Sequence, residues 1–504
     1  MCRDTFTSPR RRCPRYCLMR SPTYRGSEGL LKRSPTLAWG LLLSLVVSSL
    51  AFFLASLTSL TYPYFDDYVA LSFVIAAAYA YAASRLVKYA IAVTNPAIMI
   101  KALVLFWFLT PFLVALPFSY ITGLGLIDSY FEMVSGFTGT GLTVLNPSAE
   151  TPFVNALRAS SQWAGEVGAL FLTLILAIVF HVSPTGIVSA LGKGERVRPS
   201  MYNTLIDLIL IYLVLTIIPI VYMKLVGMSL YDAIVYTFAA LATGGFAPTA
   251  GGTADLPFVQ QLAVILTCVL GAVNFSVYLN LRYNKVRNAL KHPELRLLIA
   301  SILFYALLLL FVWKRFDAEH LWSALFHSAS AVTTSGFQIQ DVSKFGESSK
   351  YIITVAMIVG ASAFSTGGGV KLYRAYVLGK SIMKQIKSLG TPRGYVSTVT
   401  VMGKEITSEE LTTMLTVVAT YLFTMFALAL VLTEQLSAHK VKVPSIDVIF
   451  EVASAMSGTG LSSGLTAIAP PDVKITLSIA MILGKLEVLP FLFFLYDSLR
   501  SLKK

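Results

Sequence analysis

The stretch 131–143, which reads FEMVSGFTGTGLT, recurs in related form at three later places in the chain. The other copies are 235–247 (VYTFAALATGGFA), 326–338 (FHSASAVTTSGFQ) and 450–462 (FEVASAMSGTGLS). Aligned without gaps, the copies share one glycine column, which contains Gly141, Gly245, Gly336 and Gly460. A repeat of this kind predicts four similar structural elements around one axis.

The composition indicates a membrane protein. Of the 504 residues, 56% are hydrophobic and only 13% are charged, whereas soluble domains have about 25% charged residues. Since roughly 20 apolar residues cross the hydrocarbon core, the apolar runs predict ten spanning helices. These lie near 36–59, 66–88, 97–120, 155–181, 204–227, 257–280, 295–314, 350–380, 408–433 and 472–498.

The four copies fall between spans three and four, five and six, seven and eight, and nine and ten. Each has an apolar stretch of roughly ten to twelve residues, which is too short to cross a bilayer. Re-entrant hairpins fit such segments, because protein or water must surround irregular backbone at membrane depth. The predicted fold class is an all-α polytopic membrane protein, with two leading transmembrane helices and four pseudo-symmetric helix–pore-loop–helix repeats around one pore. The expected domains are a basic cytoplasmic tail (1–35), the leading helices (36–95), and repeats at 96–200, 201–292, 293–405 and 406–504.

The net charge of +14 is unevenly distributed along the chain. Most basic residues lie in the N-terminal tail, in the loops after spans two, four, six and eight, and at the C-terminus. The positive-inside rule assigns these segments, and hence both termini, to the cytoplasm. Because topology accounts for the positive charge, we expect the lipid bilayer as a partner and no nucleic acid.

Residues that could carry catalysis or bind a metal are sparse. Cys2, Cys13 and Cys17 lie in the tail without a second Cys or His pair nearby, so neither a disulfide framework nor a metal site is expected. The five histidines lack metalloprotease spacing. We therefore expect no cofactor and no enzyme activity, with a membrane enzyme as a remote alternative. The sequence leaves open whether residues 1–18 are translated or ordered.

The repeated segments suggest how a pore could bind a cation. In the first copy, residues 128–137 have helical periodicity and end at a Thr-Gly-Thr-Gly sequence. A half-helix that enters from outside directs the negative end of its dipole toward the membrane centre. The returning backbone needs φ values that glycine adopts at little cost. Four such strands would present rings of carbonyl oxygens that replace the hydration shell of an ion.

The candidate ion-binding residues are Thr138, Gly139, Thr140, Gly141, Ala242, Thr243, Gly244, Gly245, Thr333, Thr334, Ser335, Gly336, Ser457, Gly458, Thr459 and Gly460. None of them is acidic, so they suit a weakly hydrated monovalent cation better than a divalent one. Small residues also pack closely between membrane helices, which is the competing interpretation. Close packing explains one such segment but not four in register.

Six motifs resemble, in the same order, those of the TrkH-type membrane subunit in the Trk/Ktr/HKT superfamily of potassium transporters. Residues 135–141 (SGFTGTG) resemble SGFTTTG, 242–246 (ATGGF) resemble STGGF, and 333–337 (TTSGF) resemble the third filter of that family. Residues 162–168 (QWAGEVG), 365–371 (STGGGVK) and 484–487 (GKLE) resemble QWxGGxG, STGGGIK and GRLE. The resemblance extends over nearly the whole chain from the first predicted span.

The resemblance implies a homodimer with a K⁺ path through each protomer and a cytoplasmic TrkA-type regulatory subunit that binds nucleotide. In HKT relatives, a serine at the position of Gly141 accompanies sodium preference, so the glycine here favours K⁺. Two residues depart from the family pattern, since Glu166 replaces a glycine and Lys485 replaces an arginine. Glu166 implies either a helix that tolerates a carboxylate or a more acidic outer vestibule. Lys485 keeps the charge of arginine but loses its bidentate fork.

A candidate gate lies within the eighth predicted span, at Ser365, Thr366, Gly367, Gly368 and Gly369. Three glycines in a helix interior cost about 1 kcal/mol each, so an interrupted helix that lines a cavity is expected. A packing kink is the alternative. The resemblance implies a loop that obstructs the pore beneath the filter.

We hypothesise that Lys485 contacts carbonyls of this loop, or Glu487, and holds the gate shut. Snorkelling of Lys485 to the membrane interface is the alternative. Lys371 and Arg374 are expected to mark the cytoplasmic exit.

Glu132 and Glu451 occupy the same column of the first and last copies. They could attract cations at the pore mouth, but a carboxylate also stabilises a helix N-terminus. We expect the structural role, in which each glutamate ties the start of its pore helix to neighbouring backbone.

Two alternatives stay open among transporters, a Na⁺-permeable pore and an H⁺- or Na⁺-coupled carrier. Coupled carriers usually build their sites on inverted repeats and buried acids. The repeats here run in one direction, which favours a channel-like conductor.

Overall fold

The computed structural model describes residues 34–64, 66–90, 96–179, 201–283, 286–389, 399–401 and 404–502. The predicted basic tail up to residue 33, with its three cysteines, and the basic loop at 193–198 lie outside these ranges. The described part is helical except for one two-stranded sheet. The predicted all-helical class is therefore confirmed.

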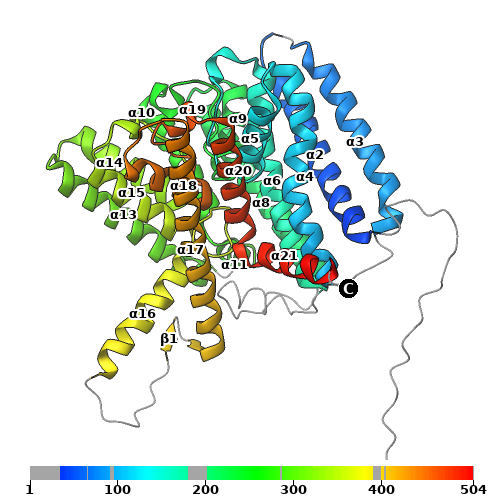
Figure 1. The fold of residues 1–504 in the computed structure, drawn as a ribbon. Coiled ribbons are helices and arrows are strands. Elements are labelled where there is room, and N and C mark those ends of the chain that lie inside the picture. The colour runs from blue at the N-terminus through cyan, green and yellow to red at the C-terminus, as the bar shows by residue number, and fades with distance from the viewer. Residues whose placement is uncertain are drawn as a thin grey trace, which may run out of the picture.

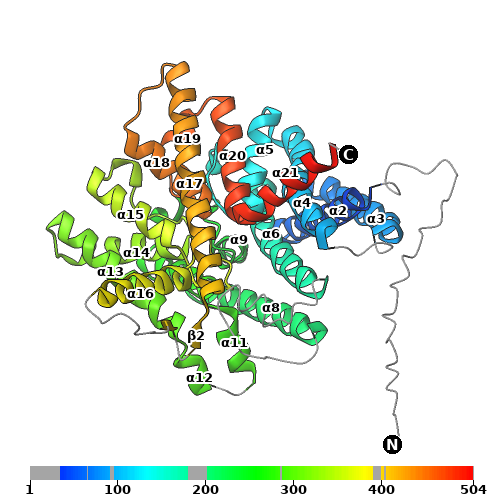
Figure 2. The same ribbon diagram turned by 60° about the horizontal axis from the view of Figure 1, so that its bottom comes forward.

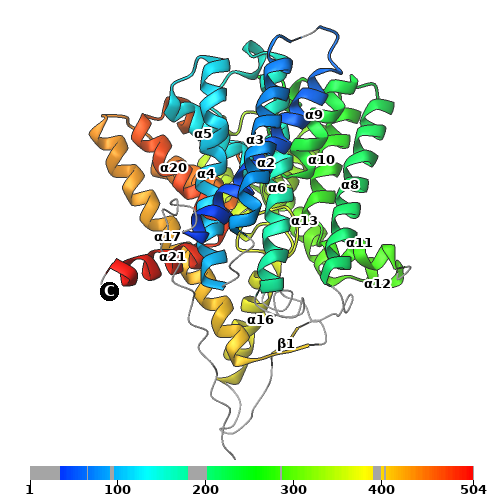
Figure 3. The same cartoon turned by 90° about the vertical axis from the view of Figure 1, so that its right-hand side faces the viewer.

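Two helices lead the chain, α2 (Pro35–Ser59) and α3 (Tyr68–Ala90), and they stand at one side of the bundle (Figures 1 and 3). α2 packs on α3, α4 and α6. Small buried residues line its contact with α3, where the Ser56 hydroxyl donates to the Ser72 hydroxyl over 2.8 Å. Small side chains allow membrane helices to approach closely.

The rest of the chain repeats one pattern four times, a helix, a short helix that stops inside the bundle, and a returning helix (Figures 1 and 2). The first two copies are α4 (Pro96–Thr122), α5 (Leu126–Phe137) and α6 (Pro152–Val179), then α8 (Met201–Leu225), α9 (Leu230–Leu241) and α10 (Phe258–Ala272). The last two are α13 (Pro293–Trp313), α14 (Ala318–Thr333) and α15 (Glu347–Val359), then α17 (Ser408–Ala438), α18 (Ser445–Ser457) and α20 (Pro471–Leu486). One helical turn lies between the short and the returning helix of each copy: η1 (Pro147–Ala149), η2 (Gly252–Asp255), η3 (Val342–Lys344) or α19 (Leu465–Ile468).

The short helices α5, α9, α14 and α18 contain 12, 12, 16 and 13 residues. Their first aligned column is apolar and completely enclosed, and it contains Phe131, Val235, Phe326 and Phe450, none more than 1% exposed. A helix this short gains its stability from burial rather than from its own hydrogen bonds. The repeated segments are therefore central elements of the core.

Three predicted spans are not continuous helices. α10 and α11 (Phe275–Arg282) meet at 87°, and α20 and α21 (Val488–Leu502) meet at 103°. α15 ends at Val359, and α16 (Leu372–Ser388) begins only after a loop. Six described helices are long and apolar enough to cross a membrane, or eight if each bent pair is one span, whereas the sequence predicted ten spans.

The two bends lie at polar residues whose side chains are held by hydrogen bonds. The Asn274 side chain accepts from the Ser276 N–H at the start of α11 and also donates to the Ala363 carbonyl. Glu487, with a φ of 55°, separates α20 from α21 and accepts two hydrogen bonds from Arg374. Hydropathy does not detect such breaks, because the residues on both sides are as apolar as in a straight span.

A projecting arm, formed by α16, two strands and the first turns of α17, extends beyond the bundle on the side of α11 and α21 (Figures 1 and 3). The strands β1 (Val399–Val401) and β2 (Lys404–Ile406) pair antiparallel. Thr407 and Glu410 then form a capping box that starts α17. The sequence did not predict these strands, and the predicted boundary between residues 405 and 406 lies inside β2. A short helix, α12 (Val286–Leu290), follows α11 on the same side of the bundle.

Candidate functional site

All four short helices end in the same way. After each helix the backbone turns at a residue with positive φ, which is Gly139 (65°), Thr243 (49°), Thr334 (55°) or Gly458 (65°). The next N–H donates to the carbonyl five residues earlier, and these bonds are Thr140–Ser135 (2.9 Å), Gly244–Ala239 (2.8 Å), Ser335–Ser330 (2.9 Å) and Thr459–Ser454 (2.9 Å). This is the Schellman arrangement, which satisfies carbonyls at a helix C-terminus and usually has glycine at the turn. Two copies hold threonine there, a strained conformation that persists only where the surroundings fix it.

We call residues 138–141, 242–245, 333–336 and 457–460 the glycine segments. Their last residues also have positive φ, with values of 95° for Gly141, 79° for Gly245, 72° for Gly336 and 86° for Gly460. The segments are adjacent in cyclic order. A Cβ added to the last glycine of each copy would overlap a backbone oxygen of the next copy, the pairs being Gly141–Gly244, Gly245–Ser335, Gly336–Thr459 and Gly460–Thr140. The four segments therefore form a closed ring that no side chain at these positions would permit.

Hydrogen bonds from neighbouring side chains hold the backbone of this ring in place. Gln162 on α6 donates from Nε2 to the Gly244 carbonyl over 2.6 Å and accepts from the Phe246 N–H over 3.3 Å. Ser135 and Ser454 accept from the N–H groups of the last glycines in their own copies, over 3.0 and 2.9 Å. The glutamine of the QWAGEVG motif thus holds the second glycine segment in place.

The side chains at one alignment position connect each short helix to the backbone that follows its glycine segment. Glu132 accepts from the Val144 N–H over 3.1 Å, and Glu451 accepts from the Ser463 N–H over 2.9 Å. In the other two copies the Tyr236 hydroxyl lies 3.1 Å from the Gly252 carbonyl, and His327 Nε2 lies 3.3 Å from the Gln340 carbonyl. The structural role expected for the glutamates is correct, but their expected place at the helix start is wrong. Each is the seventh residue of its helix, and the missed members Tyr236 and His327 were visible in the same alignment column.

A buried ion pair strengthens the first copy. Arg158 Nε lies 2.8 Å from Glu132 Oε1, and both side chains are at most 1% exposed. Arg158 also donates to the Ala247 carbonyl over 3.3 Å and lies 4.1 Å from the Phe246 ring centroid. It thereby links the backbone that follows the first and second glycine segments. Arg158 was not among the predicted site residues, although a lone arginine in an apolar span needs a buried partner.

Residues 365–369, which we call the glycine loop, lie directly beneath the ring. Thr366 Oγ1 is 3.0 Å from the Leu241 carbonyl and 3.0 Å from the Gly271 carbonyl. The Gly368 N–H donates to Thr334 Oγ1 over 2.7 Å, and a Cβ on Gly368 would overlap the Ser457 carbonyl. The loop thus touches the second, third and fourth copies. An interrupted helix was predicted here, and the break between α15 and α16 confirms it.

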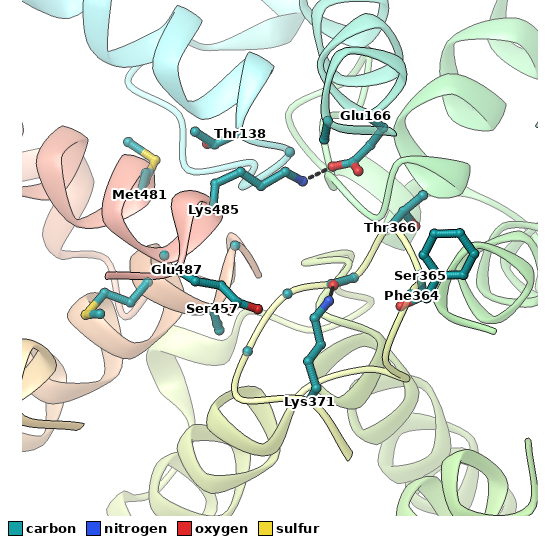
Figure 4. Close-up of a pocket in the computed structure, with 18 residues that line it drawn as sticks. Thr138, Glu166, Phe364, Ser365, Thr366, Lys371, Ser457, Met481, Lys485 and Glu487 are labelled. Atoms are coloured by element: carbon teal, nitrogen blue, oxygen red, sulfur yellow. Dashed lines mark hydrogen bonds and ion pairs between the residues drawn. The ribbon is translucent and has the colours of Figure 1, made fainter. Parts of the chain in front are cut away.

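A cavity of about 150 Å³ lies between the ring and the loop. Figure 4 shows its lining, in which Lys485 from α20 reaches Glu166 on α6, while Lys371 reaches back to the glycine loop. The lining also includes Thr138, Gly139, Ser457 and Gly458 from the ring and Glu487 from the end of α20. The site therefore combines uncharged backbone with two ammonium groups and two carboxylates.

The contacts of these charges differ from the predicted ones. Lys485 pairs with Glu166, whereas Glu487 accepts from Arg374 over 2.9 and 3.0 Å. The lysine that binds a loop carbonyl is Lys371, which donates to Gly367. Glu166 faces this cavity, so the outer-vestibule interpretation is wrong and the helix does tolerate the carboxylate. Sequence spacing missed these partners because α6 and α20 meet only in the fold.

The comparisons with known proteins agree with this geometry. The family model described as TrkH, cation transport protein, matches residues 71–501. An uncharacterized cation transporter of Methanocaldococcus jannaschii is 27% identical, over 79% of this chain and 83% of its own. The Trk system potassium uptake protein TrkH of Escherichia coli is 28% identical, but the match spans only 58% of this chain and 64% of that protein.

The crystal structure of the potassium transporter TrkH from Vibrio parahaemolyticus has the same fold. Its TM-score is 0.77 at 24% sequence identity, and the superposition covers 93% of this chain and 99% of that chain. The matched family is one of transporters, so the remote alternative of a membrane enzyme is wrong. This multi-pass membrane protein belongs to the TrkH family of cation transport proteins.

Proposed function

We propose that this protein takes up K⁺ across the cell membrane through the centre of the ring. The sixteen residues of the four glycine segments form the selectivity filter, and their carbonyl oxygens replace the water around the ion. The observation that supports this most is the cyclic contact from Gly141 through Gly245, Gly336 and Gly460 back to Thr140. No segment contains a carboxylate, which favours a weakly hydrated monovalent cation.

The choice of K⁺ rests on two further observations. The relatives from Escherichia coli and Vibrio parahaemolyticus are named potassium uptake proteins. The first filter segment ends in glycine rather than serine. K⁺ is the cargo in this proposal, and the chain itself needs no cofactor.

The glycine loop is the proposed gate of this pathway. It lies in the cavity beneath the ring, where an ion leaving the filter would have to pass. Its backbone is held by Thr366 and by the Gly368 bond to Thr334, and Lys371 supports it at Gly367. Lys371 and Arg374 border the route by which the ion then leaves toward the cytoplasm.

The proposal includes partners outside this chain. These are a second copy in a homodimer and a cytoplasmic TrkA-type subunit that binds nucleotide and moves the gate. The relatives named as parts of a Trk system support it. The basic arm helix α16 supports it as well, because the positive-inside rule puts this end of the molecule, and both termini, in the cytoplasm.

The test is ion flux into proteoliposomes that contain the purified full chain, with K⁺ and Na⁺ compared in the wild type and in Gly141→Ser. We expect K⁺ flux to exceed Na⁺ flux, and the ratio to fall about tenfold in the variant, because a hydroxymethyl group displaces the neighbouring backbone. Equal fluxes in the wild type would overturn the K⁺ assignment. An unchanged ratio in Gly141→Ser would remove this residue from the filter, and an absolute dependence on a Na⁺ or H⁺ gradient would favour a coupled carrier.

A further inference from the structure

The ion pair between Glu166 and Lys485 lies at the inner face of the ring. Glu166 belongs to the first copy and Lys485 to the fourth, so the pair bridges the closing contact of the cycle. A Cβ added to Gly139 would lie 3.1 Å from Glu166 Oε1 and 3.8 Å from Lys485 Nζ. The side chains are 4% and 15% exposed. The pair is thus in contact with the filter backbone and borders the cavity.

Two of the three cations at this cavity are paired with a carboxylate. Arg374 binds Glu487 through two hydrogen bonds, and Lys485 binds Glu166. The third cation, Lys371, donates to the Gly367 carbonyl. Glu166 is therefore the carboxylate that compensates the Lys485 ammonium group, which lies beside Gly139 of the ring.

Without the Glu166 carboxylate, the Lys485 side chain would be free to reach other acceptors in the cavity. Its ammonium group is a compact point charge on a flexible stem, with three hydrogen-bond donors. Residues of the ring and of the glycine loop line the same cavity, and their backbone carbonyls are acceptors for those donors. A tethered cation there would compete with K⁺ for the same oxygens and would repel the ion strongly, because screening is weak inside the protein.

We infer that Glu166 is a conduction-determining residue, which holds the Lys485 ammonium at the cavity wall and so keeps it out of the ion path. This inference rests on the proposed function, since it needs K⁺ to pass through the ring. Neither Glu166 nor Lys485 belongs to the proposed filter. Glu166 acts through Lys485 and is in that sense a positioning residue.

The chain offers a matched control for a purely structural role. Asp128 on α5 and Lys474 on α20 form a second ion pair between the first and fourth copies, with an Oδ1–Nζ distance of 2.6 Å. This pair connects the same two copies through the same helix α20, but neither residue lines the cavity. If the Glu166 pair only joins copies, loss of either pair should have similar consequences.

The experiment measures K⁺ flux per folded protein in proteoliposomes, with folding checked by size exclusion and thermal unfolding. Glu166→Gln should reduce K⁺ flux about tenfold or more, because the freed ammonium enters the path. The double variant Glu166→Gln/Lys485→Gln should recover flux to within about twofold of the wild type, since it removes both charges. Asp128→Asn should lower the unfolding temperature while flux per folded molecule stays within about twofold.

Three outcomes overturn the inference. They are wild-type flux in Glu166→Gln, a double variant as slow as the single one, and an equal loss of flux in Asp128→Asn. If Glu166→Gln does not fold, the double variant still tests the inference. It is expected to fold, because removal of both partners leaves no uncompensated buried charge. A flux in that variant below about a tenth of the wild type would then refute the role of Lys485 as a competing cation. A wild-type protein that conducts no K⁺ would instead refute the proposed function, and this inference with it.

Discussion

Gly460 in the fourth copy and Thr140 in the first are backbone neighbours, so close that a Cβ on Gly460 would overlap the Thr140 carbonyl oxygen. This contact closes the ring of glycine segments and brings together the two most distant copies in the sequence. Because the same relation holds between each copy and the next, the ring depends on glycine at all four positions.

Gly460→Ala should therefore abolish the ring geometry. The new methyl group has no space, and the φ of 86° disfavours any side chain. We expect K⁺ flux to fall at least about tenfold, from a displaced filter backbone or from reduced folding. Gly379→Ala is the control, since a Cβ at this helical position meets nothing within 4 Å. Flux of the Gly460 variant equal to that of the control would contradict the closed ring.

Thr366→Val should loosen the glycine loop. Valine has the shape of threonine but cannot donate to the Leu241 or Gly271 carbonyls. A lost hydrogen bond of this kind costs about 1 kcal/mol, which corresponds to a roughly fivefold larger open population. Basal K⁺ leak through the purified chain should rise accordingly, while Thr366→Ser retains the hydroxyl and the wild-type leak. A leak that rises equally in both variants would argue against the hydrogen bond as the restraint.

Glu132→Gln should be much more damaging than Glu451→Gln, although the two residues share a column. The first change leaves Arg158 buried without a countercharge, which costs about 3–5 kcal/mol. Glu451 instead accepts hydrogen bonds from uncharged hydroxyl and N–H groups. The side-chain oxygen of a glutamine can still accept some of these bonds. Thermal unfolding in detergent measures the difference. Equal losses of stability would mean that Arg158 finds compensation elsewhere.

Arg374→Lys should destabilise the junction between α20 and α21. Arginine holds both Glu487 oxygens, and lysine lacks the planar fork for this geometry. We expect a loss of about 1–2 kcal/mol in the free energy of unfolding, because two charge-assisted bonds from the buried Arg374 are stronger than a single surface pair. Lys101→Gln removes a pair with Asp497 in which the cation is more exposed than Arg374, and it should cost less than about 1 kcal/mol. The reverse order of stabilities would show that the Arg374 pair does not hold the bend.

Some features of the site could be predicted from local sequence alone. The aligned glycines and the short apolar stretches predicted re-entrant helices followed by extended segments that begin at 138, 242, 333 and 457, and the helices end within one residue of these positions. Glycine clusters predicted the interruption after α15, because glycine is unfavourable inside a helix. Both inferences use conformational preferences of neighbouring residues, which act before any tertiary contact forms.

The partners of the buried charges could not be predicted in this way. Lys485 was expected at Glu487 or at the glycine loop and instead binds Glu166, while Lys371 takes the loop carbonyl. The bends at Asn274 and Glu487 were also missed, since both lie within apolar runs that resemble straight spans.

The sequence by itself thus determined the class of protein, the four copies and the aligned glycines at which the backbone turns with positive φ. Only the tertiary structure decided which copies are adjacent, that the ring closes, and which acid neutralises which base. The physical reason is that burial and backbone preference are properties of a segment. An ion pair such as Glu166–Lys485 requires two distant helices, α6 and α20, to pack side by side, and no local pattern encodes that distance.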